Sequence, residues 1–200
     1  MKPVVFLDRD GTLNEEVGYI RELEKLALIQ GAAAAVAKLN QAGVAAILVT
    51  NQTGAARGYY SEDHICQLNK RLQDLLQENG ASLDAVYYCP HLEGGDYEPL
   101  AIKCTCRKPE PGLVRAAYDQ HPQLDRRRAY VVGDKSTDVE LARNCGAKGI
   151  LVRTGYGQSV LNGQYQWKVS PDFEAGDIVE AIDWILADLK HGVDNAVTAD

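Results

Sequence analysis

Carboxylates follow two apolar runs of this sequence, each at the point where the run ends. Asp8 and Asp10 stand two residues apart in FLDRDGT, so an extended backbone directs both side chains to the same side. Asp134 and Asp138 follow a later run in VGDKSTD. Acids that merely terminate a strand explain this pattern poorly, because unpaired charge is costly at the enclosed centre of a sheet. Carboxylates of this kind are able to hold Mg²⁺, which prefers oxygen ligands.

Hydrogen-bond donors and cations occur in two further motifs and beside the second acid pair. Thr50 and Asn51 end another apolar run in VTNQTG, and alone they are ordinary turn residues. Arg107 and Lys108 stand in RKPEPG, and Lys135 in GDKSTD; a lone Arg-Lys pair is usually a solvated patch. Together with the acids, these groups suit phosphoryl transfer. One aspartate can attack phosphorus, while a hydroxyl, an amide and a lysine stabilise charge on the phosphoryl oxygens.

Three cysteines and a histidine bracket the stretch CPHLEGGDYEPLAIKCTC. Cys89, His91, Cys104 and Cys106 make a Cys₃His set, which is a composition of tetrahedral structural zinc sites, although the spacing differs from the usual Cys-x₂-Cys knuckle. A disulfide, a catalytic thiol and chance clustering are the alternatives. A reducing compartment disfavours the disulfide, and the aspartates already supply a nucleophile. We therefore expect a zinc-binding loop at residues 89–106.

Strand and helix patterns alternate along the chain. Apolar runs predict strands at 4–7, 44–50, 84–89, 129–134 and 149–152. Periodicity and capping residues, among them Ser61 and Ser136, predict helices at 31–43, 62–78, 111–120, 136–146 and 176–189. This order predicts an α/β fold, a single Rossmann-like domain with a parallel sheet and helices on both faces. The domain is expected to span residues 1–190, with a frayed tail at 191–200.

Length and charge narrow the class of protein. The chain has 200 residues, which fits one domain with a sizeable core, and its net charge of −7 argues against a general nucleic-acid binder. No stretch approaches the roughly 20 apolar residues of a membrane span, and no signal region opens the sequence. We therefore expect a cytoplasmic protein without nucleic-acid or membrane partners. A monomer is expected because no coiled-coil or long apolar face is obvious.

The motifs FLDRDGT, VTNQTG, RKPEPG and VGDKSTD together resemble, in the same order, the four motifs of the haloacid-dehalogenase (HAD) superfamily of phosphatases. The resemblance implies that Asp8 is the nucleophile and that Asp10 is the general acid and then the general base. It implies that Thr50 and Lys108 bind the transferring phosphoryl group. Mg²⁺ would be held by Asp8, the main-chain carbonyl of Asp10, and Asp134, with Asp138 orienting Lys135 or a metal-bound water.

The cysteine loop narrows the resemblance within that superfamily. CPH followed by CxCRKPxPG is typical of the D-glycero-D-manno-heptose 1,7-bisphosphate phosphatases, and TNQTGAARGYY is similar to their second motif. These enzymes remove the 7-phosphate during nucleotide-heptose synthesis for lipopolysaccharide, and they carry a zinc loop and no large cap domain. The resemblance implies a small phosphorylated sugar as substrate, with EEVGY departing from the DHGY-like stretch of many members. The implied substrate contacts are Glu16, Val17, Gly18, Tyr19, Asn51, Gln52, Thr53, Arg107 and Lys135.

Three other functions remain to be distinguished. Histidinol-phosphate phosphatase, or another small sugar-phosphate phosphatase, would share the superfamily motifs and a similar zinc loop. A signalling receiver domain also places acids and a lysine at strand ends, but its acceptor aspartate follows the third strand, where this chain has Cys89. A zinc-stabilised binding module without catalysis is the third, and the intact acid pair argues against it.

Overall fold

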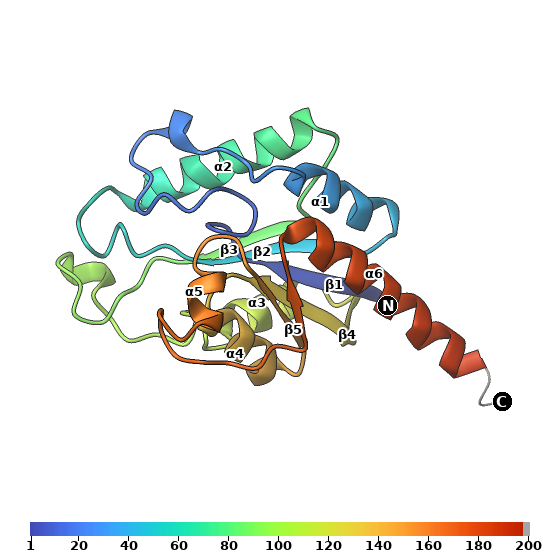
Figure 1. Ribbon diagram of the computed structural model, residues 1–200. Coiled ribbons are helices and arrows are strands. Elements are labelled where there is room, and N and C mark those ends of the chain that lie inside the picture. The colour runs from blue at the N-terminus through green and yellow to red at the C-terminus, as the bar shows by residue number, and fades with distance from the viewer. Residues whose placement is uncertain (198–200) are drawn as a thin grey trace.

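Six parallel strands form one sheet in the computed structural model (Figure 1). The structure describes residues 1–197 and, for residues 192–197, the backbone alone. All neighbouring strands pair in parallel. The central strands are continuous apolar runs because both faces of the sheet are covered. Their order across the sheet is β3 (Ala85–Cys89), β2 (Ala45–Asn51), β1 (Lys2–Leu7), β4 (Leu124–Gly133), β5 (Lys148–Val152) and β6 (Phe173–Ala175).

Helices cover both faces of the sheet, as predicted. Along β1, Val5 and Leu7 point to one face and Val4 and Phe6 to the other, because side chains alternate along a strand. The helices on the two faces lie above and below the sheet in Figure 1. The Val5 face packs against α1 (Ala32–Gln41), α2 (Glu62–Glu78) and α6 (Ile178–Val197), and the Val4 face packs against α3 (Gly112–Gln120) and α4 (Ser136–Cys145).

The strand order reverses direction between β1 and β4, and this reversal positions the site. After β1 the chain builds β2 and β3 on one side, then crosses to β4 and continues outward through β5 and β6. The carboxyl ends of β1 and β4 therefore open the crevice in which ligands of such folds bind. Asp8 follows β1, and its backbone N–H donates to the Val132 carbonyl of β4 at 2.9 Å. Asp134 follows β4 directly, so the two acids become neighbours.

Two short elements are absent from the sequence prediction, and strand β4 begins five residues earlier than predicted. Helix α5 (Gly157–Leu161) and strand β6 are too short to show a period. Strand β4 begins at Leu124 rather than at residue 129, since three consecutive arginines hide the strand pattern there.

The limits of α4 and α6 also differ from the prediction. Ser136 was expected to cap α4 but is its first helical residue; Lys135 precedes it, and the Lys135 N–H donates to the Asp138 carboxylate at 3.0 Å. Helix α6 continues past the predicted end at residue 189 to Val197. Residues 191–197 are thus helical, while residues 198–200 of the expected frayed tail lie outside the described residues.

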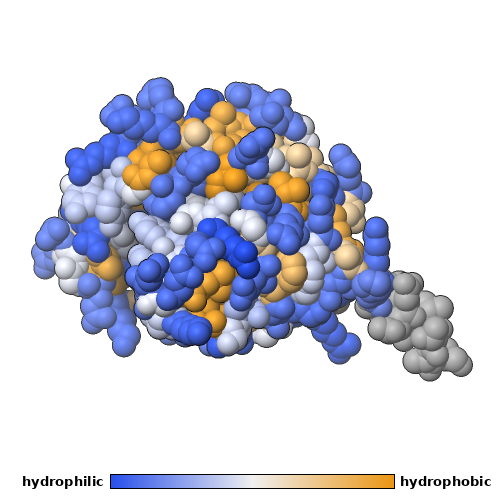
Figure 2. Space-filling model, in the orientation of Figure 1, coloured by the Kyte–Doolittle hydropathy of each residue, from blue (hydrophilic) through white to orange (hydrophobic). Residues whose placement is uncertain are grey.

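The loops carry only short additional elements within the described part of the chain. Two 3₁₀ turns, η1 (Leu23–Lys25) and η2 (Glu98–Leu100), lie between strands, and no inserted cap domain occurs among residues 1–197. The face seen in Figure 2 is mostly hydrophilic, with small apolar areas between charged side chains. Among the described helices, none combines the length and the apolar character that crossing a membrane requires.

Candidate active site

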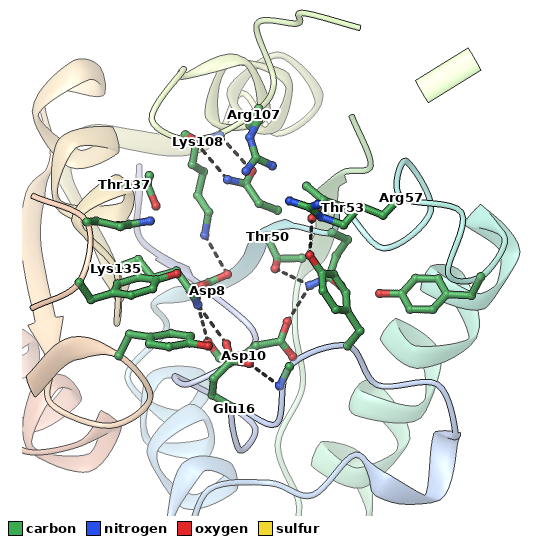
Figure 3. A pocket seen from close by; sticks show the side chains of 18 residues that line it. Asp8, Asp10, Glu16, Thr50, Thr53, Arg57, Arg107, Lys108, Lys135 and Thr137 are labelled. Atoms are coloured by element: carbon green, nitrogen blue, oxygen red, sulfur yellow. Dashed lines mark hydrogen bonds and ion pairs between the residues drawn. The ribbon is translucent and has the colours of Figure 1, made fainter. Parts of the chain in front are cut away.

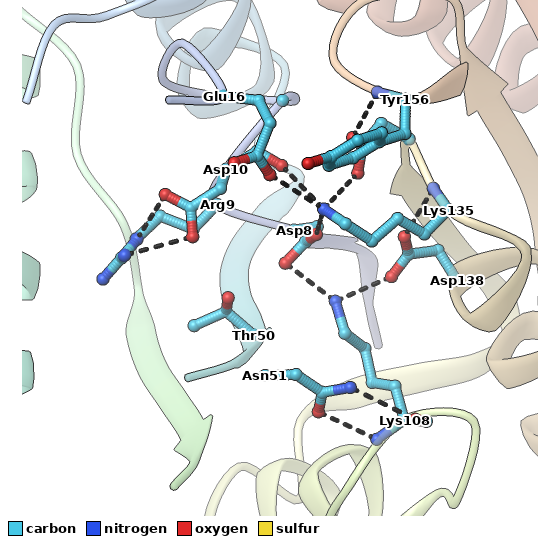
Figure 4. Close-up of polar contacts among 12 residues, drawn as sticks. Asp8, Arg9, Asp10, Glu16, Thr50, Asn51, Lys108, Lys135, Asp138 and Tyr156 are labelled. Atoms are coloured by element: carbon cyan, nitrogen blue, oxygen red, sulfur yellow. Dashed lines mark hydrogen bonds and ion pairs between the residues drawn. The ribbon is translucent and has the colours of Figure 1, made fainter. Parts of the chain in front are cut away.

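Asp8 lies at the end of β1, where a buried lysine holds it. Lys108 Nζ is 2.8 Å from Asp8 Oδ1 and 2.7 Å from Asp138 Oδ1 (Figure 4). Lys108 also donates to the Val49 carbonyl at 2.9 Å. Burial alone would raise the pKa of Asp8, but attraction by Lys108 and then by Lys135 outweighs burial and lowers this pKa below its ordinary value. Asp8 is therefore ionised at neutral pH, as a carboxylate nucleophile must be.

A second lysine occupies a cradle of oxygen atoms beside Asp8. Lys135 Nζ lies 2.9 Å from Asp134 Oδ1, 3.3 Å from Glu16 Oε2 and 3.4 Å from the main-chain oxygen of Asp10. Asp8 Oδ2 is 3.8 Å away from the same ammonium group. The contacts converge in Figure 4. The oxygens predicted to hold Mg²⁺ therefore surround the positively charged ammonium group of Lys135.

The chemistry of these ligands fits a hard divalent cation. Ligand oxygens of Asp8, Asp134 and Asp138 all lie within 4.8 Å of one another. Burial raises the pKa of Asp134 to about 7, even though Lys135 favours its ionised form. A bound cation would offset this penalty, and Mg²⁺ takes such oxygen ligands. Asp8, Asp134 and the main-chain oxygen of Asp10 could therefore hold Mg²⁺ at this position.

The side chain of Asp10 turns away from this cradle to a different set of partners. Arg9 contacts both carboxylate oxygens, at 3.2 and 3.1 Å, and Gln52 Nε2 donates to Oδ2 at 2.8 Å. Asn14 Nδ2 donates to Oδ1 at 2.9 Å. Arg9 is itself buried and donates to Asn69 of α2 at 3.1 Å. The sequence analysis did not predict that Arg9 holds Asp10. The available signal was the position of this basic residue between two acids.

Two glycines leave room for the carboxylate of Asp134. Its Oδ2 atom accepts a hydrogen bond from the Tyr156 N–H at 2.8 Å. A Cβ atom added at Gly11 or Gly155 would lie 2.3 or 2.2 Å from this same oxygen. Both glycines also have positive φ, +82° and +55°, which other residues adopt at a cost. The acid and its surroundings therefore require glycine at both positions.

The substitution Gly155→Ala is expected to weaken Mg²⁺ binding about 10- to 100-fold, the range typical of groups that orient a metal ligand. The new methyl group would displace the Asp134 carboxylate. Titration calorimetry of the metal measures the change. Gly163→Ala is the matched control, because Gly163 also has positive φ but no neighbour within 4 Å of an added Cβ. Equal Mg²⁺ affinity in the two variants would contradict the role given to Asp134.

The four ligands expected for zinc converge at the end of β3. The Cys106 sulfur lies 3.1 Å from that of Cys89 and 3.3 Å from that of Cys104, and His91 Nδ1 is 3.3 Å from the Cys106 sulfur. These thiols are free, so the disulfide alternative is wrong for the structure. Burial raises the pKa of Cys89, which disfavours a reactive thiolate. The Cys₃His set could hold zinc tetrahedrally.

Metal analysis is expected to find about one zinc ion per chain, lost in Cys104→Ser and retained in the matched control Cys66→Ser. Cys66 lies outside the cluster. Because Arg107 follows Cys106 directly, loss of zinc should lower kcat/KM about 10- to 100-fold while the circular dichroism of the sheet persists. Reduced, zinc-free protein with full activity would contradict the proposed loop function.

A pocket of about 290 Å³ opens over Asp8 (Figure 3). Val17 does not line it, and its side chain is exposed. Asn51 lines the pocket, but its amide is engaged with the backbone of Lys108, at 3.1 and 3.0 Å. Of the predicted catalytic and substrate residues, those that line the pocket are Asp8, Asp10, Glu16, Gly18, Tyr19, Thr50, Asn51, Gln52, Thr53, Arg107, Lys108 and Lys135.

Six further lining residues were not predicted. Arg57 and Tyr60 belong to TNQTGAARGYY, whose motif letters offered a signal. Thr137 lies in the first turn of α4. The rings of Tyr156 and Tyr165 stack at 4.1 Å, and Gln166 joins them from a segment without a recognisable pattern.

An ionised aspartate at a strand end, between a buried lysine and an acidic cation cradle, defines a hydrolase of the HAD type. The HAD-hydrolase-like family model matches residues 105–181. A D-glycero-D-manno-heptose-1,7-bisphosphate 7-phosphatase of Thermosynechococcus vestitus is 53% identical over 94% of this chain and 97% of that protein. D-glycero-beta-D-manno-heptose-1,7-bisphosphate 7-phosphatase of Escherichia coli K12 is 37% identical over 96% and 93%. The chain therefore belongs to this family of HAD phosphatases.

A solved structure agrees with this membership. The D,D-heptose 1,7-bisphosphate phosphatase of B. bronchiseptica, complexed with magnesium and phosphate, superimposes with a TM-score of 0.81 at 28% identity. The match covers 94% of this chain and 99% of that one. The predicted superfamily and fold are confirmed, the receiver-domain alternative is rejected, and the protein is a phosphoric monoester hydrolase.

Proposed function

We propose that the protein hydrolyses the 7-phosphate of D-glycero-D-manno-heptose 1,7-bisphosphate in nucleotide-heptose biosynthesis. The observation that carries the proposal is the ionised Asp8 carboxylate between Lys108 and the oxygen cradle. This arrangement suits attack on phosphorus at the pocket floor. The family membership, at 53% identity to a phosphatase named for this sugar, supports the choice of substrate.

Each reactive group has a distinct task in the proposed reaction. Asp8 attacks the phosphorus atom, and the bond from phosphorus to the sugar oxygen breaks. Asp10 gives a proton to the departing oxygen, then takes one from the water that hydrolyses the aspartyl phosphate. Lys108 and the Thr50 hydroxyl offset charge on the transferring phosphoryl group. The phosphate and the Asp8 carboxylate are then free.

The metals are proposed to have separate roles. Mg²⁺, held by Asp8, Asp134 and the main-chain oxygen of Asp10, would reduce repulsion between the carboxylate and the anionic phosphate. Zinc on the Cys₃His set would order the loop that ends on Arg107 and Lys108.

We further propose which residues contact the substrate. Substrate contacts are assigned to Glu16, Gly18, Tyr19, Thr53 and Lys135, which line the pocket, with Asn51 and Gln52 positioning their neighbours. We propose one phosphatase domain at residues 1–190 acting as a cytoplasmic monomer.

A side-by-side assay distinguishes the proposed substrate from histidinol phosphate. With Mg²⁺ present, we expect kcat/KM for heptose 1,7-bisphosphate to exceed that for histidinol phosphate by more than about 100-fold, since groups built to bind a second phosphate stay unpaired with the other substrate. Release of inorganic phosphate measures both reactions. Faster turnover of histidinol phosphate would reject the assignment, and Mg²⁺-independent binding without hydrolysis would favour a binding module.

A further inference from the structure

Arg9 is a buried cation that contacts Asp10 from outside the pocket. It is 1% exposed and does not line the pocket, whereas Asp10 does. Arg9 Nε lies 3.2 Å from Asp10 Oδ1 and Nη2 lies 3.1 Å from Oδ2, on the side of Asp10 away from Lys135 (Figure 4). Paired contacts of this kind fix the orientation of a carboxylate as well as its position. Arg9 can therefore affect the reaction only through the residues that it holds.

The Gln52 side chain connects the same guanidinium to the same carboxylate. Arg9 Nη2 donates to Gln52 Oε1 at 2.8 Å, and Gln52 Nε2 donates to Asp10 Oδ2 at 2.8 Å and to the Thr50 hydroxyl oxygen at 3.0 Å. The opposite amide orientation would set Oε1 against the carboxylate and the NH₂ group against the guanidinium. Arg9 therefore fixes the orientation of the amide, and it holds Asp10 both directly and through Gln52.

The buried face of α2 contributes one polar residue to this network. Asn69 shares that face with Leu68 and Leu72, and its Oδ1 atom accepts a hydrogen bond from Arg9 Nη1 at 3.1 Å. Among the described side chains, Asn69 Nδ2 has no hydrogen-bond partner. A buried donor without a partner costs stability, and burying an ion pair seldom adds any. Stability alone therefore explains the network poorly, and a role in the reaction explains it better.

We propose that Arg9 is a positioning residue that keeps the Asp10 carboxyl group in one place for both of its proton transfers. In the first step the bond from phosphorus to the sugar oxygen breaks, and the proton of Asp10 passes to that oxygen. In the second step water attacks phosphorus, the bond to Asp8 breaks, and a proton of the water passes to Asp10. A misplacement of about 1 Å can lower such rates about 100-fold. This inference rests on the proposed function.

A double-mutant cycle with Asp10→Asn tests this role. Arg9→Lys keeps the charge but loses the paired contact, so kcat for heptose 1,7-bisphosphate should fall about 10- to 100-fold while KM changes less than about threefold. In the Asp10→Asn protein the same change should lower kcat less than about threefold, because the group that Arg9 positions is already lost. Arg128→Lys is the matched control, since Arg128 also contacts an aspartate, Asp125 at 2.8 Å, but does not line the pocket. It should leave kcat unchanged in both backgrounds.

The outcomes separate this inference from the proposed function. Equal falls in the two backgrounds, or an unchanged kcat in Arg9→Lys, would overturn the role of Arg9 while the proposed function stands, because a merely structural residue acts whether or not Asp10 is present. If Arg9→Lys does not fold, Asn69→Ala takes its place in the cycle. It removes one acceptor of Arg9 and should lower kcat about 3- to 10-fold only where Asp10 is intact, as expected for one lost hydrogen bond; equal falls would again overturn the inference. A wild-type protein that does not hydrolyse the bisphosphate would reject the proposed function and this inference with it.

Discussion

Asp8→Asn is expected to lower kcat for phosphate release by about 10⁴-fold or more, because an amide cannot replace a carboxylate nucleophile. The substitution preserves size, and Lys108 keeps its ion pair with Asp138, so the protein should remain folded. Mass spectrometry of acid-quenched wild-type enzyme should detect a phosphorylated peptide containing Asp8. That peptide should be absent from the variant.

Asp10→Asn provides the comparison for this prediction. Loss of a general acid and base costs roughly 10²–10⁴-fold, and Asn would keep hydrogen bonds with some of the groups that hold Asp10. The Asp10 variant should therefore retain more activity than the Asp8 variant. An Asp8→Asn protein with more than a tenth of wild-type kcat, or an Asp10→Asn protein with full activity, would contradict the mechanism.

Lys108→Met is expected to destabilise the fold by about 3–5 kcal/mol at neutral pH, as breaking a buried ion pair does. Lys108 is 3% exposed and touches two carboxylates, Asp8 and Asp138. Burial lowers the pKa of Lys108, but attraction to Asp138 and then to Asp8 outweighs burial and raises this pKa. The cation is therefore permanent, and Met would leave two buried carboxylates without it. Urea denaturation measures the loss.

The stability lost in Lys108→Met should increase with pH. Burial raises the pKa of Asp138 even though Lys108 partly offsets the shift, and the variant removes that offset. A carboxyl group whose pKa is higher in the folded state than in the unfolded chain lowers the free energy of unfolding at pH values above the folded-state pKa. This loss becomes smaller as the pH falls toward 3.8, the ordinary pKa of the group in the unfolded chain. The deficit relative to wild type should be larger at about pH 8 than at about pH 5. A deficit that is equal at both pH values would contradict the buried ion-pair explanation.

The sequence predicted which side chains gather because the carboxyl ends of parallel strands meet at one edge of the sheet. Asp8 and Asp134 follow strands whose apolar runs are long enough to recognise, and the two strands pair directly. Lys108 was predicted from its motif, although its contact with Asp138 depends on how the zinc loop ends. The four zinc ligands were predicted from their Cys₃His composition, supported by the family resemblance, and they converge.

Features that depend on tertiary contacts could not be predicted from the sequence. The orientation of the Asp10 side chain depends on the nearby Arg9 and Asn14 and also on Gln52, which stands 42 residues away in the chain. Gly155 matters only because the turn after β5 approaches Asp134. The exposure of Val17 follows from the path of an irregular loop. Periodicity carries no information about such contacts.

The central claim is that the Asp8 pocket removes the 7-phosphate and leaves the 1-phosphate on the sugar. Phosphorus-31 NMR of purified protein with Mg²⁺ and D-glycero-D-manno-heptose 1,7-bisphosphate tests this directly. The resonance of the C7 monoester should disappear as inorganic phosphate appears, while the C1 resonance persists. Loss of the C1 phosphate, or no turnover by folded protein containing zinc and Mg²⁺, would contradict it.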